Sequence, residues 1–204
     1  MNADLDFHQD GKLVIALSGA VASGKTAALE EFAALGAETI CADKLAAKHR
    51  TALKEKIKSA FGTDDNKQLA QIILQDREKL KQLENMLHPL VLKEAKEIIK
   101  NTTKKIIVFA VPLLFEKGLE DSFDLTICIY TSYKKRLKRA LKRGTTETYF
   151  NWCEQTQLPM VEKAERADII IFNEGPLVNL RGKITRLYKT LKNNNEDNLW
   201  KTKK

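Results

Sequence analysis

Residues 13–26 read LVIALSGAVASGKT, and this stretch decides the fold of the chain. Leu13–Leu17 is a short apolar run typical of a buried strand. Gly19–Thr26 fits the pattern G-x-x-x-x-G-K-[ST]. The Ala- and Glu-rich residues 27–35 have helical periodicity and precede Gly36, a common helix stop. Strand, glycine-bounded loop and helix therefore follow one another in the order of a phosphate-binding loop.

The loop pattern predicts a site for a nucleotide polyphosphate. Glycines at both ends let the backbone curl so that successive N–H groups point inward, and the N-terminus of the following helix adds partial positive charge. Lys25 can reach the β- and γ-phosphates, and Thr26 can offer its hydroxyl to Mg²⁺. We expect ATP and Mg²⁺ to bind here, and the predicted nucleotide contacts in the loop are Gly19, Ala22, Ser23, Gly24, Lys25 and Thr26.

The composition suits a globular protein with an anionic partner. The 204 residues are 43% hydrophobic and 30% charged, and no apolar run approaches the length of a membrane span. Residues 1–12 lack the features of a secretory signal, and the scattered Cys41, Cys128 and Cys153 favour reduced thiols in the cytoplasm. The formal charge of +8 would attract nucleic acid, an anionic membrane or a phosphorylated small molecule alike.

Four further strand-like runs predict a doubly wound, parallel sheet. They cover residues 37–42, 105–111, 123–130 and 168–172, and they alternate with helical segments. Asp43 directly follows the first of these runs. Ligands of open α/β sheets lie beyond the carboxyl ends of the strands, so Asp43 could face the phosphate loop. It could equally cap the next helix, and both interpretations can hold.

Residues 44–100 are helical in pattern, with little strand signal. A turn cluster at 62–66 divides the region, and Pro89 should kink or restart the helix that carries it. His88 precedes this proline, and a lone histidine in a helix is more often structural than functional. Downstream, residues 146–166 are helical with a break at Pro159, residues 177–191 form a terminal helix, and residues 193–204 should fray.

Residues 131–145 carry seven basic side chains and no acidic one. On a helix Arg136, Arg139 and Arg143 form one stripe. Charge runs are usually solvated faces, but this run follows a strand of a phosphate-binding sheet, which favours arginines that close over ATP. A groove for nucleic acid would also be basic. It would usually interleave aromatic side chains, and only Tyr133 lies within this run.

Taken together, these stretches resemble the dephospho-CoA kinases, the P-loop enzymes that place the 3′-phosphate on coenzyme A. The matching pieces in chain order are GAVASGKT, CADKLA, LENMLHPLV, VPLLFE, LKRALKR, QLPMVEKAERAD and IIIFNEG. The resemblance covers residues 13–191, and its specificity comes from the ordered set rather than from the loop alone. Family loops typically read GGIGSGK, so Ala20 and Ala22 replace two glycines here.

The resemblance implies an α/β fold, a P-loop NTPase-type three-layer sandwich with a five-stranded parallel sheet, a helical substrate-binding insertion and a helical lid. The chain would be a single P-loop kinase domain over residues 1–204. The implied parts are a nucleotide-binding core at 11–43, 103–132 and 167–192, a helical CoA-binding subdomain at 44–102 and a basic lid at 133–166.

The resemblance also implies roles on the acceptor side. Asp43 matches the acid that orients or deprotonates the ribose 3′-hydroxyl, and an aspartate is normally ionised at neutral pH. His88, Leu113 and Glu116 match positions that bind the acceptor, dephospho-CoA. These residues, with Asp43, are the predicted acceptor-binding set.

On the nucleotide side, Arg143 and Arg139 match lid arginines that neutralise charge on the transferred phosphoryl group, and Asn173 matches a residue near the adenine. Arg143 joins Lys25 and Asp43 as the predicted catalytic set. Three further residues match lid and hinge positions without an assigned role, namely Gln157, Lys163 and Arg166.

The predicted function is ATP- and Mg²⁺-dependent phosphorylation of dephospho-CoA to coenzyme A, the last step of coenzyme A biosynthesis, by a cytoplasmic phosphotransferase. We expect ATP and dephospho-CoA as partners, no nucleic acid or membrane, and a monomer or weak homo-oligomer. Three alternatives stay open. The chain could be another P-loop kinase of a small molecule such as a nucleoside or nucleotide, a nucleotide-binding protein with weak or no transfer activity, or a nucleic-acid-binding protein.

Overall fold

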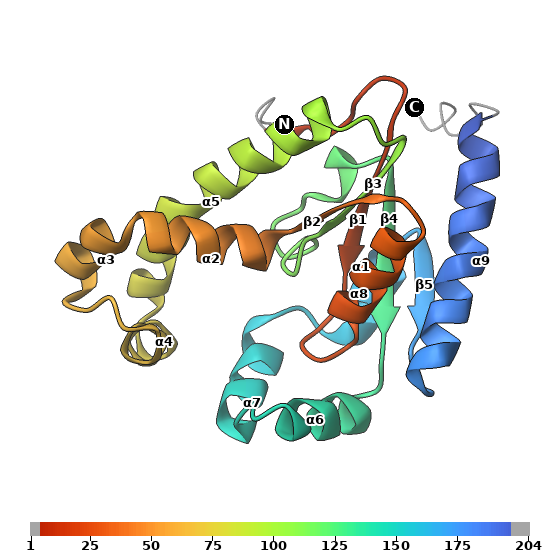
Figure 1. The fold of residues 1–204 in the computed structure, drawn as a ribbon. Coiled ribbons are helices and arrows are strands. Elements are labelled where there is room, and N and C mark those ends of the chain that lie inside the picture. Colours follow the sequence, from red (N-terminus) through yellow and green to blue (C-terminus); the bar gives the residue numbers. More distant parts are fainter. Residues whose placement is uncertain (1–4, 197–204) are drawn as a thin grey trace. The chain divides into compact units, whose positions relative to one another are not determined.

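The computed structural model of the protein describes residues 5–196 (Figure 1). Within it the chain divides into two compact units, one formed by residues up to Ile40 and from Ile99 onward, the other by Cys41–Ile98. The predicted fraying concerns residues 193–204. Residues 193–196 continue the last helix, and the rest of that segment lies outside the described residues.

The first unit is built on a five-stranded parallel sheet, as the sequence predicts. Its strands are β1 (Leu13–Ser18), β2 (Glu38–Cys41), β3 (Ile106–Ala110), β4 (Leu125–Tyr130) and β5 (Ile169–Phe172), in the spatial order β2-β3-β1-β4-β5. Every residue of β1 and β3 is buried, so both faces of the sheet are covered, and this explains the uninterrupted apolar runs.

The central strand β1 lies between β3 and β4, with Leu17 opposite both Ala110 and Ile127. The chain leaves β1 towards the β3 side and later returns to the β4 side. The carboxyl end of β1 is therefore the point where the order of the strands reverses, which is where open α/β sheets bind ligands. The glycine-bounded loop follows β1 at this point.

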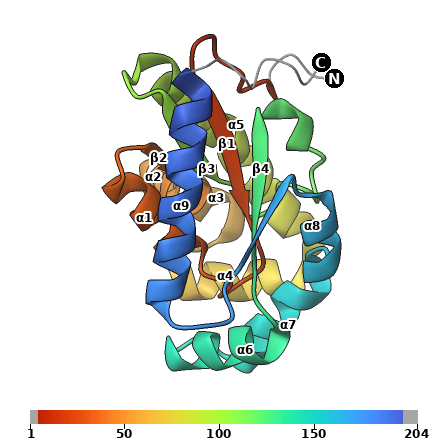
Figure 2. The ribbon, with the colours of Figure 1, turned by 90° about the vertical axis from the view of Figure 1, so that its right-hand side faces the viewer.

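Helices of the first unit pack on the sheet and on each other. Their bounds are α1 (Lys25–Ala34), α6 (Tyr133–Lys142), α7 (Glu147–Thr156), α8 (Met160–Arg166) and α9 (Leu177–Glu196), with a short 3₁₀ helix, η2 (Glu120–Ser122). Helix α1 packs against β1, β3 and α9, and α9 also contacts β5, while α8 packs against β4 (Figure 2). The break predicted at Pro159 separates α7 from α8.

The second unit is helical, with α2 (Ala42–Ala52), α3 (Lys54–Phe61), α4 (Asn66–Gln75) and most of α5 (Arg77–Asn101). Its core consists of Ile57, Phe61, Leu69, Leu83 and Leu87. The predicted turn at 62–66 is confirmed. Gly62 ends α3 with a φ of +76°, and the Asp65 carboxylate caps α4 by accepting bonds from the Lys67 and Gln68 N–H groups in the first turn of the helix.

The sequence predicts a kink or a restart of the helix at Pro89, and the restart is wrong because Pro89 lies inside α5. A proline removes the hydrogen bond to the carbonyl four residues earlier, here that of Asn85. Asn85 and Pro89 are both exposed, so the Asn85 carbonyl lies on the solvent-exposed face of the helix, where it can accept a hydrogen bond from water. The helix therefore continues through the proline.

A buried ion pair joins α6 to α7. Arg136 is only 2% exposed, and its guanidinium donates two bonds to the Glu154 carboxylate at 2.5 and 2.6 Å and one to the Thr131 carbonyl at 2.9 Å. The guanidinium also lies 5.6 Å from the centre of the Phe150 ring. Arg136 therefore faces α7, and the predicted stripe of three arginines available to ATP is reduced to two.

Replacement of Glu154 by alanine should destabilise the first unit, because the buried Arg136 charge loses its bidentate partner. We expect a loss of about 2 kcal/mol, below the usual range for a buried pair because Glu154 is partly exposed. Urea denaturation followed by circular dichroism measures this. Glu165→Ala, at an exposed position of α8, is the control, and equal midpoints for the two variants would contradict the prediction.

Candidate active site

The two framing glycines of the phosphate-binding loop are required by close contacts as well as by backbone geometry. Gly19 has a φ of +143° and Gly24 a φ of +112°, regions that L-residues rarely adopt. A Cβ on Gly19 would lie 2.8 Å from the Ile129 carbonyl oxygen, and one on Gly24 would lie 2.3 Å from the Asn173 side-chain nitrogen. Only glycine fits at either end of the loop.

The two alanines inside the loop have different surroundings. Ala22 has a φ of +58°, the left-handed conformation in which a Cβ is strained. Ala20 has no positive φ and is 2% exposed, because it packs with Cys128, Met160 and Ala164. One replacement therefore stores strain, whereas the other supplies a methyl group that joins the loop to β4 and α8.

The N-terminus of α1 suits an anion. The helix begins at Lys25, its N-cap Gly24 provides no side-chain bond, and its first turn holds no acidic residue. By contrast, α4 and α7 are capped by Asp65 and Thr146. The N-cap residue thus offers the first N–H groups of α1 no side-chain acceptor, and these groups with the helix dipole favour a phosphate group.

Lys25 and Thr26 stand at this helix start. The Lys25 ammonium donates to the carbonyl oxygens of Gly19 and Ala20, at 2.5 and 3.0 Å, so it lies over the loop. Thr26 is exposed beside it. The structure thus places a cation and a hydroxyl at the predicted phosphate position.

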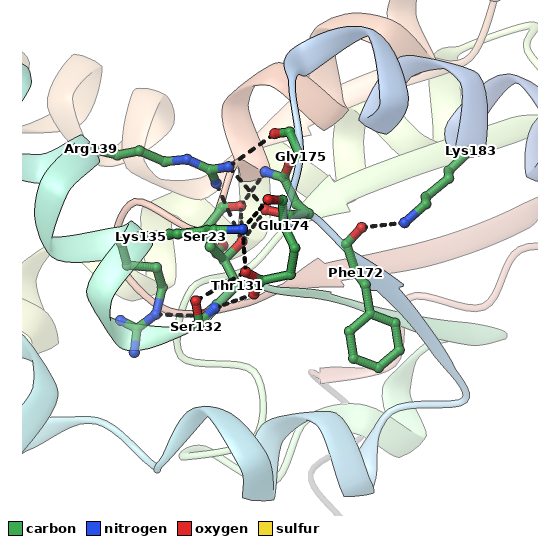
Figure 3. A network of polar contacts seen from close by, with 11 residues as sticks. Ser23, Thr131, Ser132, Lys135, Arg139, Phe172, Glu174, Gly175 and Lys183 are labelled. Carbon is green, nitrogen blue, oxygen red and sulfur yellow. Dashed lines mark hydrogen bonds and ion pairs between the residues drawn. The ribbon is translucent and has the colours of Figure 1, made fainter.

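The Ser23 carbonyl is the centre of a hydrogen-bond network behind the loop (Figure 3). It accepts one bond from the Thr131 hydroxyl, at 2.9 Å, and one from the Asn173 amide, at 2.7 Å. Arg139 joins the same network, because its guanidinium donates to the Asn173 carbonyl at 2.9 Å. The structure therefore brings Arg139 and Asn173 to the loop. Thr131 is a member that the sequence pattern did not single out.

Glu174 extends this network to the start of α6. Its carboxylate accepts bonds from the Ser132 N–H and hydroxyl, and it lies 3.0 Å from the Lys135 ammonium. Burial acts to raise the pKa of Glu174, but the bonds from Ser132 and Lys135 outweigh it and hold that pKa below its usual value. The carboxylate is therefore ionised at neutral pH and fixes the beginning of α6 beside the loop.

The predicted acceptor segment after β3 is tied to α8. Glu116 lies in the turn that follows β3, and its carboxylate is 2.6 Å from the Lys163 ammonium, which is fully buried. Leu113, in the same turn, is half-buried. The sequence resemblance assigns Lys163 no individual role. The spacing of Met160, Lys163 and Ala164 on one helix face is the signal that could have shown its burial.

The remaining predicted residues are at exposed positions. Arg143 is exposed and follows the last turn of α6. Asp43 and His88 are exposed residues of the second unit. Cys41 is the N-cap of α2, so the interpretation of Asp43 as a helix cap is wrong. Asp43 lies instead in the first turn, where its negative charge still suits the helix dipole.

Comparisons with known proteins decide the family. The profile of the dephospho-CoA kinase family matches residues 13–179. The chain belongs to this family. Its members are kinases that use ATP and dephospho-CoA.

Similar proteins agree with this assignment. The chain is 31% identical to the dephospho-CoA kinase of Fusobacterium nucleatum, over 88% of this chain and 98% of the relative. It is 32% identical to that of Aquifex aeolicus, over 87% and 96%. Among solved structures, a Thermus thermophilus protein gives a TM-score of 0.78 at 28% identity, over 88% and 98%.

A more distant structure supports the fold alone. Shikimate kinase from Acinetobacter baumannii gives a TM-score of 0.55 at 17% identity, covering 89% of this chain and 95% of that one. The sheet and loop described above are thus those of a P-loop kinase. Within the part of the chain that the structure describes, no helix has the length and apolar character needed to cross a membrane.

Gly24→Ala should abolish nucleotide binding, because the new methyl group would displace the Asn173 amide from the Ser23 carbonyl. Gly11→Ala is the matched control, since Gly11 also has a positive φ, of +72°, but open space around its Cβ position. Titration with ADP by calorimetry should give no measurable binding for Gly24→Ala and wild-type affinity for Gly11→Ala. Equal affinities for the two variants would contradict the role of the close contact.

Ala22→Gly should stabilise the protein slightly. Glycine removes the strain of a Cβ in the left-handed conformation, which stabilises the folded state. It also increases the conformational entropy of the unfolded chain, but this effect is smaller, and we expect a net gain in the free energy of unfolding of about 0.5 kcal/mol. Thermal or urea denaturation without ligand measures this difference. A loss of stability would mean that Ala22 is held without strain.

Proposed function

We propose that this chain transfers the γ-phosphoryl group of ATP to the ribose 3′-hydroxyl of dephospho-CoA, which yields coenzyme A and ADP. The observation that carries the proposal is the family match over residues 13–179, which begins at the strand leading into the phosphate-binding loop. The uncapped start of α1 and the position of the Lys25 ammonium support a triphosphate at this loop.

In this proposal the loop and Lys25 hold the β- and γ-phosphates, and the fixed N–H groups of α1 offset their charge. The Thr26 hydroxyl is an oxygen ligand of the kind that Mg²⁺ accepts. Across residues 5–196 no group of three or more His, Cys, Asp or Glu side chains could hold a metal alone. Mg²⁺ would therefore be held by phosphate oxygens, water and Thr26, as is usual for this ion. Bound there, it offsets negative charge on the phosphates.

On the acceptor side, Asp43 takes the proton of the ribose 3′-hydroxyl while the 3′-oxygen attacks the γ-phosphorus of ATP. The bond between the γ-phosphorus and the oxygen that bridges it to the β-phosphate breaks, and ADP is released. Arg143 and Arg139 from the basic segment 133–166 neutralise charge on the transferred group. The helical residues 44–102, with His88, hold the coenzyme A moiety together with Leu113 and Glu116. The proposal also includes a cytoplasmic monomer or weak homo-oligomer, and the three free cysteines suit a reducing compartment.

A coupled assay of ADP release tests the proposal with a panel of acceptors under identical conditions. We expect turnover with dephospho-CoA that exceeds turnover with nucleosides, nucleotides or water by at least 100-fold. Preference for a nucleoside or nucleotide would identify a different small-molecule kinase. No release above background with millimolar dephospho-CoA would contradict the proposal.

Asp43→Asn should lower kcat by about 100-fold or more, because general base catalysis contributes on this scale, while ATP affinity changes little. Asp64→Asn removes a partly exposed carboxylate of the same unit, one that pairs with Lys54, and serves as the control. Steady-state kinetics with dephospho-CoA measures both variants. Full turnover in Asp43→Asn would remove the base role and leave the kinase assignment intact.

A further inference from the structure

Lys163 is a fully buried cation whose bonds reach three separate places in the chain. Its ammonium lies 2.6 Å from a Glu116 carboxylate oxygen, 3.2 Å from the Pro112 carbonyl and 3.3 Å from the Gln157 side-chain oxygen. An ammonium has three N–H donors, so these three acceptors match its capacity. The contacts join α8 to the turn after β3 and to the junction between α7 and α8.

Glu116 completes this junction from the other side. The carboxylate oxygen that meets Lys163 also accepts a hydrogen bond from the Leu158 N–H, at 3.0 Å. The second carboxylate oxygen is buried without a hydrogen-bond partner. The chain bends between α7 and α8 at residues 157–159, so one carboxylate fixes the backbone at the bend and the cation that follows it.

Stability alone does not account for this pair. Burying two charges carries a large desolvation cost, and well-packed apolar side chains often stabilise a protein equally well or better. The two charges instead impose a specific geometry, because each of their hydrogen bonds fixes the distance between two segments that are far apart in the sequence. The pair therefore specifies an arrangement rather than a large gain in stability.

Helix α8, which carries Lys163, also packs on the phosphate-binding loop. Met160 and Ala164 of α8 pack on Ala20 of the loop and on Cys128 of β4. Burial raises the pKa of the Cys128 thiol to about 12, and the nearby charges of both Lys163 and Lys25 oppose that rise. The ammonium of Lys163 thus acts on the same neutral thiol as the lysine of the loop.

The connection continues to the predicted lid. The Arg136–Glu154 pair joins α6 to α7, and Arg139 lies one turn further along α6. A change in the angle at 157–159 would therefore move α7 and act through this pair on α6, whose start is fixed by Glu174 and whose Arg139 is bonded to the Asn173 carbonyl. The turn after β3, fixed by the same pair, carries Leu113 and Glu116 of the predicted acceptor side.

We infer that Lys163 is a positioning residue, which through Glu116 holds the acceptor-side turn 112–116 and the α7–α8 junction in the one arrangement that aligns the acceptor with the lid arginines. The inference rests on the proposed function and extends it to a residue that touches neither substrate. Its loss should misalign the reactants, and displacements of about 1 Å can cost about 100-fold in rate.

Lys163→Met should lower kcat at least 10-fold and raise KM for dephospho-CoA, with KM for ATP within twofold of wild type. Glu120→Gln is the matched control. Glu120 is the partner of Arg166, which lies on α8 like Lys163, and this pair is partly exposed. Its loss should leave kcat and KM for dephospho-CoA within twofold of wild type. A wild-type kcat and KM in Lys163→Met would overturn the inference.

The double variant Lys163→Met with Glu116→Gln separates positioning from stability. Neither charge remains, so its unfolding midpoint should recover towards wild type, while kcat stays at least 10-fold low. Recovery of both midpoint and kcat would overturn the inference, because the pair would then serve stability only. Glu116→Asp, which keeps the charge but shortens the side chain, should also lower kcat, and wild-type turnover there would equally count against it.

A structural measurement keeps this test independent of the acceptor. Hydrogen exchange of the peptide 157–160, which contains the Leu158 N–H, should be at least 10-fold faster in Lys163→Met than in wild type and unchanged in Glu120→Gln. Inactivity of the wild type with dephospho-CoA would contradict the proposed function alone, and unchanged exchange in Lys163→Met would contradict the role of the pair.

Discussion

Two hydrogen bonds to one carbonyl oxygen, that of Ser23, hold the phosphate-binding loop from behind. They come from Thr131 and Asn173, which directly follow β4 and β5. Because these strands are parallel neighbours, their carboxyl ends bring the two side chains to the same edge as the loop. The loop is thus shaped before any phosphate arrives, and little ordering cost remains for binding.

Other features of the site follow from this constraint. Gly24 must lack a side chain because the Asn173 amide occupies the space where a Cβ would lie. Arg139 reaches the loop by donating to the Asn173 carbonyl, so a residue of the basic helix is held next to the loop. Strain at Ala22 is tolerated because the surrounding bonds fix the backbone on both sides.

Much of the fold was predictable from the sequence, because each strand is a local apolar run and the loop pattern carries its own geometry. The partners of the loop were not predictable in the same way. Ser23 is 108 residues from Thr131 and 150 from Asn173, so no local spacing brings them together. For Arg136, helical spacing gave the stripe correctly, but its burial depends on Glu154, which the following helix supplies. The restart predicted at Pro89 is wrong because α5 continues through this residue, and the Asn85 carbonyl that loses its partner belongs to an exposed residue.

The charged residues discussed above are of two kinds. Arg136 and Lys163 are buried in ion pairs and fix the geometry of the first unit, whereas Arg143 and Asp43 are exposed. The position of the transferred phosphate tests the whole account most directly. After reaction with ATP and dephospho-CoA, phosphorus NMR and mass spectrometry of the product should show one coenzyme A, phosphorylated at the ribose 3′-oxygen, for each ADP. ADP with only free phosphate, or phosphate on another hydroxyl, would contradict it.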